Sequence, residues 1–401
     1  MKQPSEGYRF GLSQELRSLR GRNKAEAREH LTVEKQTHAY RLAEVLYRNR
    51  KQEHEQFDRR EFDEKTPSED LEIVLVSNEP SLFETFEYIK DVSGAGVGVG
   101  FDQMLDVAVN SKLEDVFITD INPPNLFATR GLLEVGRKFH MLHGRYPSPE
   151  EYLAFFEPKN LPLTLEMIES EFSRKELNII RNAYGKCFYY ESSVVLHSNA
   201  VKGPPAVHHY LSYKAGQTDY NSWLSSQKNL EKVICMYEER HLRAIRADLA
   251  GSESIPLLGK NLAAKGAPLS LLYISNTLEF LTEYGRMRDM MGDVDNFFHN
   301  LGELPVSDQT MIVHTGRYSR ETKLPPSLQK SDDRYLKQFF HQWSYVVQSM
   351  RSYRQFSEQA LNIGNPCYVM RAGLRVLFQR GGHHISPKPG VYIIDVPMTS
   401  K

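Results

Sequence analysis

The sequence is poor in cysteine and in net charge, and both shortages narrow the classes of protein it can belong to. Only 3 cysteines occur in 401 residues, at Cys187, Cys235 and Cys367, far apart and without a metal-ligand spacing. We therefore expect neither a disulfide framework nor a structural zinc site. Lys and Arg number 50 against 51 Asp and Glu. Such a balance gives no overall field that would draw the chain to nucleic acid or to an anionic membrane.

Long apolar runs are also absent. No stretch approaches the roughly 18 consecutive apolar residues that a membrane-spanning helix needs, and the first residues, MKQPSEGYRF, lack the apolar core of a signal peptide. With 40% hydrophobic and 25% charged residues, the composition is that of a globular protein with one large domain or two smaller ones. We expect a cytoplasmic location and no nucleic-acid or membrane partner, and the oligomeric state stays open.

Several catalytic signatures are missing as well. The chain has no phosphate-binding G-x-x-x-x-G-K-[ST] loop, no G-x-S-x-G nucleophile turn and no His-Glu-x-x-His zinc motif. Adjacent histidines occur at 208–209 and 383–384, but neighbouring side chains on a strand point to opposite faces. We therefore expect no metal site.

The strongest positive signal lies in two short segments. Residues 95–103, AGVGVGFDQ, and residues 116–122, VFITDIN, predict a strand, a glycine turn, a helix and a second strand. Asp120 ends the second strand, 20 positions after Gly100. Rossmann-type sheets begin in this way when they hold a nucleoside, because glycine lets the backbone approach the ligand and the carboxylate accepts hydrogen bonds from ribose hydroxyls.

Strand and helix signals alternate through the following residues, which predicts parallel βαβ units and an open, doubly wound sheet. Near the end of the chain, residues 334–353 have apolar side chains at helical spacing. Two apolar runs follow, joined by RGGHHISPKPG, a turn-rich segment that would let the last two strands pair antiparallel. The expected strands are residues 96–100, 116–120, 242–248, 269–275, 311–314, 374–378 and 391–396, and the expected helices between them are residues 104–109, 255–264 and 278–288.

Two regions extend this α/β core. Residues 1–70 are rich in charge and predict an N-terminal helical extension, so that the α/β domain proper takes residues 71–401. Residues 148–239 form an insertion much longer than an ordinary crossover, with tyrosine, phenylalanine and histidine gathered in it. The insertion is either a cap that binds a substrate over the strand ends or a helical subdomain with an aromatic core.

Polar residues gather where the predicted strands end. In an open α/β sheet the ligand lies outside the carboxyl ends of the strands, near the point where the strand order reverses. Each such residue alone could instead cap a helix or shape a turn, but five strand ends converge. The candidate cofactor-binding residues are Gly96, Gly98, Gly100, Phe101, Asp102, Gln103, Asp120, Asn122, Asp248, Leu249, Ser275 and Asn276.

These segments also resemble a known family. GVGVGFDQMLDVA, FITDINPPNL, RADLAG, and LLYISNTLEFL followed by LGELP are similar to a bacterial family of largely uncharacterised proteins with a class I S-adenosylmethionine-dependent methyltransferase-like Rossmann domain. The family's signatures run approximately G-V-Y-L-G-V-G-P-E-Q-N, V-D-I-R-x-x-N-L and Y-x-S-N-V-E-x-Y-L. Phe101-Asp102-Gln103 departs from Pro-Glu-Gln but keeps an acid before an amide, and Pro123-Pro124 replaces a basic pair.

The order of the expected elements predicts a doubly wound, mostly parallel, seven-stranded sheet with an antiparallel C-terminal strand, and the resemblance implies a methyltransferase-like fold with a pocket for S-adenosylmethionine. Backbone groups at Gly98 and Gly100 would lie against the methionine moiety, Asp120 would accept the ribose hydroxyls, and Asp248 with Leu249 would contact adenine. Ser275 and Asn276 would line the opening for an unidentified methyl acceptor.

Asn276 and His314 are the weak candidates for a catalytic role, the histidine as a general base. A catalytically inactive interaction protein of the same fold is the alternative. An NAD-dependent oxidoreductase is a third possibility, disfavoured because the glycine segment departs from G-x-G-x-x-G.

Overall fold

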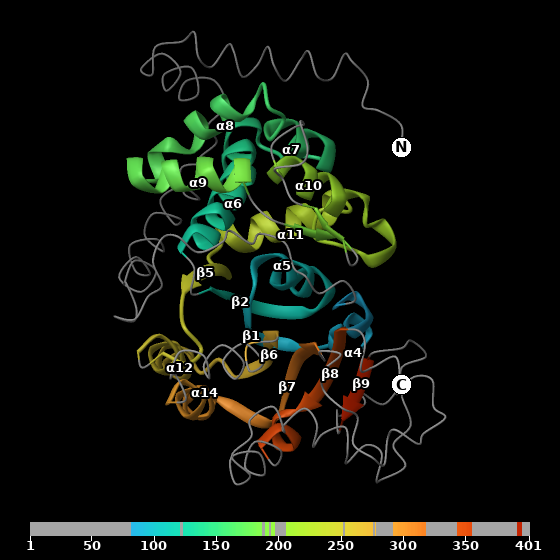
Figure 1. Ribbon diagram of the computed structural model, residues 1–401, viewed down its shortest axis with the longest axis vertical. Coiled ribbons are helices and arrows are strands. Elements are labelled where there is room, and N and C mark those ends of the chain that lie inside the picture. The colour runs from blue at the N-terminus through green and yellow to red at the C-terminus, as the bar shows by residue number, and fades with distance from the viewer. Residues whose placement is uncertain are drawn as a thin grey trace. The chain divides into compact units, whose positions relative to one another are not determined.

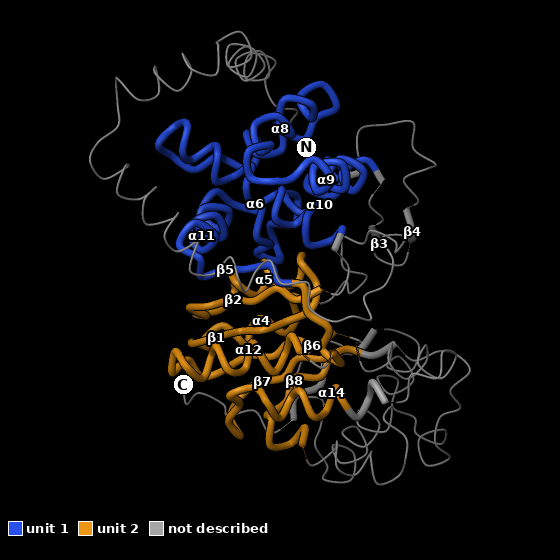
Figure 2. Tube along the Cα trace, turned by 90° about the vertical axis from the view of Figure 1, so that its left-hand side faces the viewer, with its two compact units in different colours: residues 1–61, 67–76, 122–245 blue, residues 62–66, 77–121, 246–401 orange. Residues whose placement is uncertain are grey.

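A helical segment, residues 122–245, and the residues on either side of it fold into two separate units, coloured blue and orange in Figure 2. In the described part of the chain, unit 1 takes residues 122–245, and unit 2 takes residues 77–121 and 246–401. The computed structural model describes residues 82–120, 123–186, 189–191, 194–196, 206–251, 253–275, 277, 292–317, 343–354 and 391–394.

The main sheet is mixed and mostly parallel (Figure 1). Its strand order is β5-β2-β1-β6-β7-β8-β9. The pairs β1–β2, β1–β6, β6–β7 and β8–β9 are parallel, and β7–β8 is antiparallel. The strands are β1 (Ser93–Val99), β2 (Lys112–Asp120), β5 (Leu242–Arg246), β6 (Leu269–Ser275), β7 (Val306–Arg317), β8 (Trp343–Ser349) and β9 (Val391–Ile394).

The strand order places β1 at a reversal point. Taken in chain order, the first five strands of this sheet lie third, second, first, fourth and fifth across it, which is the arrangement that begins a dinucleotide-binding Rossmann sheet. Strand β2 pairs with one side of β1, and β6, which comes later in the chain, pairs with the other side. The direction in which successive strands are added therefore reverses at β1. Ligands of open α/β sheets bind at the carboxyl edge of such a reversal.

Helix α5 (Phe101–Asn110) packs on β1 and β2. It can do so because β1 has a glycine, Gly98, where α5 comes closest to it. A Cβ atom at Gly98 would collide with the sulfur of Met104 in α5 and would lie 2.9 Å from Cβ of Tyr273 in β6. The α5 side chains Met104, Leu105 and Ala108 are fully buried. Gly98 therefore occupies a position where only a bare backbone lets helix and sheet meet.

The other described helices of unit 2 are short or of moderate length. The 3₁₀ turn η1 (Leu82–Thr85) leads into α4 (Phe86–Ile89), which packs on α5. Helix α12 (Ser254–Ala264) follows β5, and α14 (Gly292–Glu303) precedes β7. These two helices pack against each other, and Figure 1 shows them as neighbours.

Unit 1 is mainly helical and is organised around its longest helix, α6 (Pro123–His143). Helices α7, α8, α9 and α11 all contact α6. The other described elements are α7 (Pro149–Phe155), α8 (Leu161–Ile168), η2 (Glu169–Glu171), α9 (Arg174–Lys186), β3 (Tyr189–Glu191) paired antiparallel with β4 (Val194–Leu196), α10 (Ala206–Gly216), η4 (Thr218–Tyr220) and α11 (Gln227–Glu238).

The aromatic side chains of unit 1 form its core. Tyr152 meets Trp223 edge to face with ring centroids 6.1 Å apart, and Phe156 meets Tyr184 at 5.6 Å. All four side chains are almost completely buried. These residues therefore fit a helical subdomain with an aromatic core. Unit 1 is also wider than residues 148–239, because α6 lies before that range and packs on the helices within it.

Most of the predicted parallel strands are confirmed in position. Residues 269–275 form β6 as expected, and the other four predicted strands overlap β1, β2, β5 and β7. Helices α5 and α12 confirm two predicted helices. The N-terminal extension, the helix over residues 278–288 and the strand over residues 374–378 lie outside the described residues.

The predicted helix over residues 334–353 is wrong over residues 343–349, which form strand β8, and of its described residues only those from Met350 on are helical. The side chains from Tyr345 to Ser349 are buried on both faces of the sheet, and a short apolar run of this kind cannot be told from a buried helix by periodicity. Strand β9 lies parallel to β8, and the partner strand of the expected terminal hairpin, residues 374–378, lies outside the described residues. Within the described ranges, no helix has the length and apolar character needed to cross a membrane.

We predict that Gly98→Ala destabilises unit 2 by about 1 to 3 kcal/mol, because the added Cβ overpacks the contact with Met104 and Tyr273. Urea unfolding of the full chain measures the change in free energy. Gly302→Ala is the matched control: it lies in α14, and an added Cβ there would meet no neighbouring atom within 4 Å. Alanine at this position should stabilise the helix by up to about 1 kcal/mol. Equal effects at both positions would contradict the packing role of Gly98.

Candidate functional site

The glycine turn and Asp120 lie side by side at the carboxyl edge of the sheet. Val99 is opposite Thr119 in the β1–β2 register, so Gly100 and Asp120 follow at the same level. Two hydrogen bonds fix this pairing: the Gly100 N–H donates to the Thr119 carbonyl at 3.3 Å, and Thr119 Oγ1 donates to the Gly98 carbonyl at 3.0 Å. Gly100 has φ +89°, a conformation that glycine adopts without strain.

The first turn of α5 begins directly at this edge. Gly100 is the N-cap residue and has no side chain that could accept from the first-turn N–H groups. A helix N-terminus favours negative charge through its dipole and its N–H groups. The edge thus combines a bare backbone turn, a helix N-terminus and the half-buried Asp120.

Strand β6 brings Ser275 to the same edge from the other side of β1. Gly98 is opposite Tyr273, and β6 ends two residues later at Ser275. Ser275 has φ +51°, in the left-handed region that residues other than glycine rarely adopt. Such backbone conformations cost free energy and concentrate at functional sites. Ser275 is therefore a structurally distinctive residue at the reversal point.

The loop after β5 lies beside Asp120, because the Ala247 N–H donates to the Asp120 carbonyl at 3.1 Å. Within this loop the Ala250 N–H donates to Asp248 Oδ1 at 2.8 Å, which closes a turn. Two side chains from elsewhere, Ser254 and Asn300, hold the loop backbone. Asp120 and the half-buried Asp248 therefore end neighbouring segments of one edge.

Other predicted site residues are buried in the interior of unit 2. Phe101, Asp102 and Gln103 are each less than 9% exposed in the first turn of α5, and Leu249 is 4% exposed. Gly96 lies beneath Leu113, where a Cβ would not fit. These five residues shape the edge from below. Asn122 and Asn276 lie outside the described residues.

His314 is a poor candidate for a general base. It is 5% exposed on β7, and burial lowers its pKa from 6.5 to about 3, so that it is neutral at physiological pH. Its Nε2 lies 2.8 Å from Nε2 of Gln348 in β8, and its ring meets Tyr353 at 5.6 Å. If the amide group donates, the histidine proton is on Nδ1. A base this weak contributes little to proton transfer near pH 7.

Three residues of the edge were missed by sequence analysis: Thr119, Ser254 and Asn300. Each acts through a hydrogen bond to backbone elsewhere in the chain, and Asn300 does so over 49 to 51 residues. No local sequence pattern predicts such hydrogen bonds. No group of three or more His, Cys, Asp or Glu side chains in the part of the chain that the structure describes could hold a metal ion.

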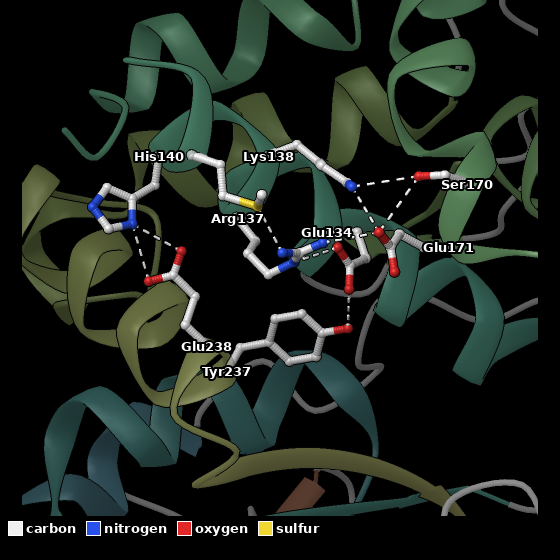
Figure 3. Close-up of polar contacts among 9 residues, drawn as sticks. Glu134, Arg137, Lys138, His140, Ser170, Glu171, Tyr237 and Glu238 are labelled. Atoms are coloured by element: carbon white, nitrogen blue, oxygen red, sulfur yellow. Dashed lines mark hydrogen bonds and ion pairs between the residues drawn. The ribbon is translucent and has the colours of Figure 1, made fainter. Parts of the chain in front are cut away.

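Unit 1 contains a cluster of charged side chains, shown in Figure 3. Within α6, Arg137 donates to Glu134 at 2.7 Å, and both side chains are 3% exposed. Arg137 also donates to Glu171 of η2 at 3.1 Å. Tyr237 of α11 donates to the second oxygen of Glu134 at 2.8 Å. Because the last two contacts join α6 to η2 and to α11, the cluster holds the helices of unit 1 together.

We predict that Glu134→Gln destabilises unit 1 by about 3 kcal/mol, because it leaves the buried Arg137 charge without its nearest carboxylate. Thermal or urea unfolding of the full chain, followed by circular dichroism of its helices, measures the loss. Lys159→Met, which removes a more exposed ion pair with Glu157, should change stability by less than about 1 kcal/mol. A loss of the same size in both variants would show that burial of the pair does not matter.

We predict that His314 makes the fold less stable in mild acid. Its folded pKa of about 3 is below the ordinary 6.5, so below pH 6.5 the unfolded chain binds a proton that the folded chain refuses. Above pH 6.5 the histidine is neutral in both states and does not change the free energy of unfolding. As the pH falls from 6.5 toward 3, the free energy of unfolding decreases progressively, and the decrease is about 2 kcal/mol at pH 5.

Urea unfolding at pH 7.5 and pH 5 tests this dependence. His314→Gln should lose about 2 kcal/mol less than wild type between the two pH values. His299→Gln, with a side chain 72% exposed in the wild type, should follow the wild-type dependence. Identical pH dependences for wild type and His314→Gln would refute the prediction.

Comparison with known proteins gives one family match. The chain matches no curated protein. Residues 74–367 match a family model described as a domain of unknown function, DUF7790. The match covers the described residues of both units except strand β9, and well over half of the 401 residues. The chain therefore belongs to the DUF7790 family.

Proposed function

We propose that unit 2 binds S-adenosylmethionine at the carboxyl edge of β1, β2 and β6 and transfers its methyl group to an acceptor. The observation that carries the proposal is the locked pairing of the Gly100 turn with Asp120 at the reversal point of the strand order. A nucleoside needs a close backbone approach and a carboxylate for its ribose at this place. The resemblance of these segments to methyltransferase-like domains selects the cofactor.

The residues of the edge fit such a cofactor in type and position. Asp120 is half-buried, so its carboxylate can accept hydrogen bonds from ribose hydroxyls. The turn at Gly100 and the start of α5 suit the carboxylate of the methionine moiety, because a helix N-terminus favours an anion. Asp248 lies beside Asp120 and would face the base.

The chemistry asks little of the protein beyond positioning. The bound cofactor supplies an activated methyl group on a sulfonium. Holding an acceptor in line with that group provides much of the rate, and a base is required only where the acceptor carries a proton. Ser275, fixed at the reversal point with its unusual backbone conformation, would line the path of the acceptor. The burial of His314 is therefore no obstacle to this proposal.

NAD is the second candidate ligand, and one observation favours it. Strand β8 lies next to β7, so the sixth strand of the sheet in chain order takes the sixth place, as in dinucleotide-binding Rossmann sheets. Against it, β8 runs antiparallel to β7, whereas strands of that fold are mostly parallel.

Titration calorimetry with S-adenosylmethionine, S-adenosylhomocysteine and NAD tests the proposal. We expect S-adenosylhomocysteine to bind the full chain, and Asp120→Ala to weaken its binding by about 10-fold or more, because the ribose loses a charged hydrogen-bond acceptor. Asp115→Ala is the matched control, since it changes an aspartate on the same strand at the far side of the buried segment. Its affinity should stay that of wild type.

Three outcomes would count against the proposal. Selective binding of NAD would replace the cofactor. The absence of binding to any of the three ligands would favour an inactive protein of this fold. Unchanged affinity in Asp120→Ala would move the site away from the β1–β2 edge.

A further inference from the structure

One histidine of unit 1 is fixed in place by a carboxylate and by an aromatic ring. His140 lies in the last turn of α6, and its Nδ1 is 2.8 Å and 3.0 Å from the two carboxylate oxygens of Glu238, the last residue of α11. The ring of Tyr146 stacks on the imidazole, with the ring centroids 4.0 Å apart and 20° between the planes. These contacts fix both the position and the orientation of the imidazole ring.

Tyr146 also holds the carboxylate that holds the histidine. Its hydroxyl donates to Glu238 Oε2 at 3.1 Å. Burial, together with the charge of Glu238, raises the pKa of this hydroxyl well above its ordinary value, so the hydroxyl stays protonated and keeps donating. Histidine, carboxylate and tyrosine are therefore joined pairwise by three contacts.

The hydrogen bond to Glu238 decides which ring nitrogen of His140 can react. An ionised carboxylate only accepts hydrogen bonds, so Nδ1 carries the proton and the lone pair of the neutral ring lies on Nε2. Among the residues that the structure describes, none hydrogen-bonds to Nε2. Figure 3 shows this nitrogen pointing away from Glu238 and from the other residues drawn. Because the side chain is 32% exposed, a small molecule in solution can reach Nε2.

The neighbouring thiol is less suited to attack an electrophile. Cys235 precedes Glu238 by one turn of α11. Burial, followed by the nearby carboxylate of Glu239, raises the pKa of the Cys235 thiol. The thiol is then protonated near pH 7, whereas the thiolate is the reactive form of cysteine. In this cluster the imidazole is therefore the better nucleophile.

We propose that His140 is a nucleophilic catalytic residue for activated acyl donors, namely thioesters and esters with a good leaving group, and that Glu238 is its positioning residue. A carboxylate that orients an imidazole and stabilises its positive form is a recurring arrangement in acyl transfer. All three residues of the cluster belong to unit 1. The site is therefore independent of the cofactor proposed for unit 2.

The reaction has two steps. Nε2 forms a bond to the acyl carbon, and the bond from that carbon to the leaving oxygen or sulfur breaks, with its electron pair going to the leaving group. The acylated ring keeps its Nδ1 proton and is positively charged, and Glu238 stabilises that charge. Water then attacks the acyl carbon and the bond to Nε2 breaks. The carboxylic acid leaves, one proton passes to the solvent, and the neutral ring is restored.

Diethyl pyrocarbonate, an activated acyl donor, tests the reactivity of each histidine in the full chain when the products are located by peptide mass spectrometry. His299 of α14 is the comparison, because its side chain is 72% exposed and its Nε2, rather than its Nδ1, lies 3.9 Å from a carboxylate of Glu303. Exposure alone would make His299 react faster. We expect His140 to react about 10-fold faster than His299, because a hydrogen bond to a charged group stabilises the ring as it becomes positive.

Three variants separate activation of His140 from its exposure. Glu238→Gln keeps the size of the side chain and should slow the reaction of His140 about 10-fold. Tyr146→Phe keeps the stacked ring but removes the hydrogen bond to Glu238. It should slow the reaction several-fold, and it carries the test if circular dichroism shows that Glu238→Gln does not fold. Glu231→Gln is the matched control, since it removes an exposed carboxylate of the same helix, and it should leave the rate unchanged.

Hydrolysis of p-nitrophenyl acetate measures turnover. His140→Gln should release nitrophenolate several-fold more slowly than wild type, and His299→Gln should keep the wild-type rate. Equal rates in wild type and His140→Gln would overturn the catalytic role. Labelling that is faster at His299 than at His140, or that is unchanged at His140 in the folded Glu238→Gln and Tyr146→Phe variants, would overturn the role of Glu238. Faster labelling of His140 that falls in both variants and not in Glu231→Gln supports the proposal.

Discussion

The contact between α5 and β1 is the constraint on which the candidate site depends. Helix and strand meet at Gly98, where a side chain would strike Met104 on one side and Tyr273 on the other. This close packing brings the chain directly from β1 into α5 through the turn at Gly100. The same short connection places the helix N-terminus next to Asp120. A bulkier residue at position 98 would push the helix away and separate these features.

The edge of the sheet next to this contact contains buried and half-buried residues, which have different roles. The buried residues Phe101, Asp102 and Gln103 pack in the first turn of α5 and support the edge. Asp120 and Asp248 are half-buried and hold their places through backbone hydrogen bonds rather than through their own carboxylates alone. Such a rigid, internally satisfied framework is what a binding site needs if its polar groups are to meet a ligand without reorganisation.

The parallel part of the sheet was predictable from the sequence. Strand β8 and the hydrogen bonds from Asn300 that hold the loop after β5 were not. Buried strands such as β6 have apolar runs of ordinary strand length between turn signals, and the glycine turn with Asp120 has a recognisable spacing. Strand β8 is buried on both faces, so its sequence suits a helix equally well. Asn300 reaches a loop about fifty residues earlier in the chain. That bond depends on the packing of α14 on α12, which no local pattern specifies.

The central claim is that the edge formed by the Gly100 turn, Asp120 and Ser275 is a nucleoside site. A crystal structure of the full chain with S-adenosylhomocysteine tests it most directly. If the edge binds the nucleoside, the ribose hydroxyls will lie within hydrogen-bonding distance of the Asp120 carboxylate and the homocysteine part will lie at the start of α5. A ligand bound elsewhere on the chain, with this edge unchanged and Asp120 facing solvent, would contradict it.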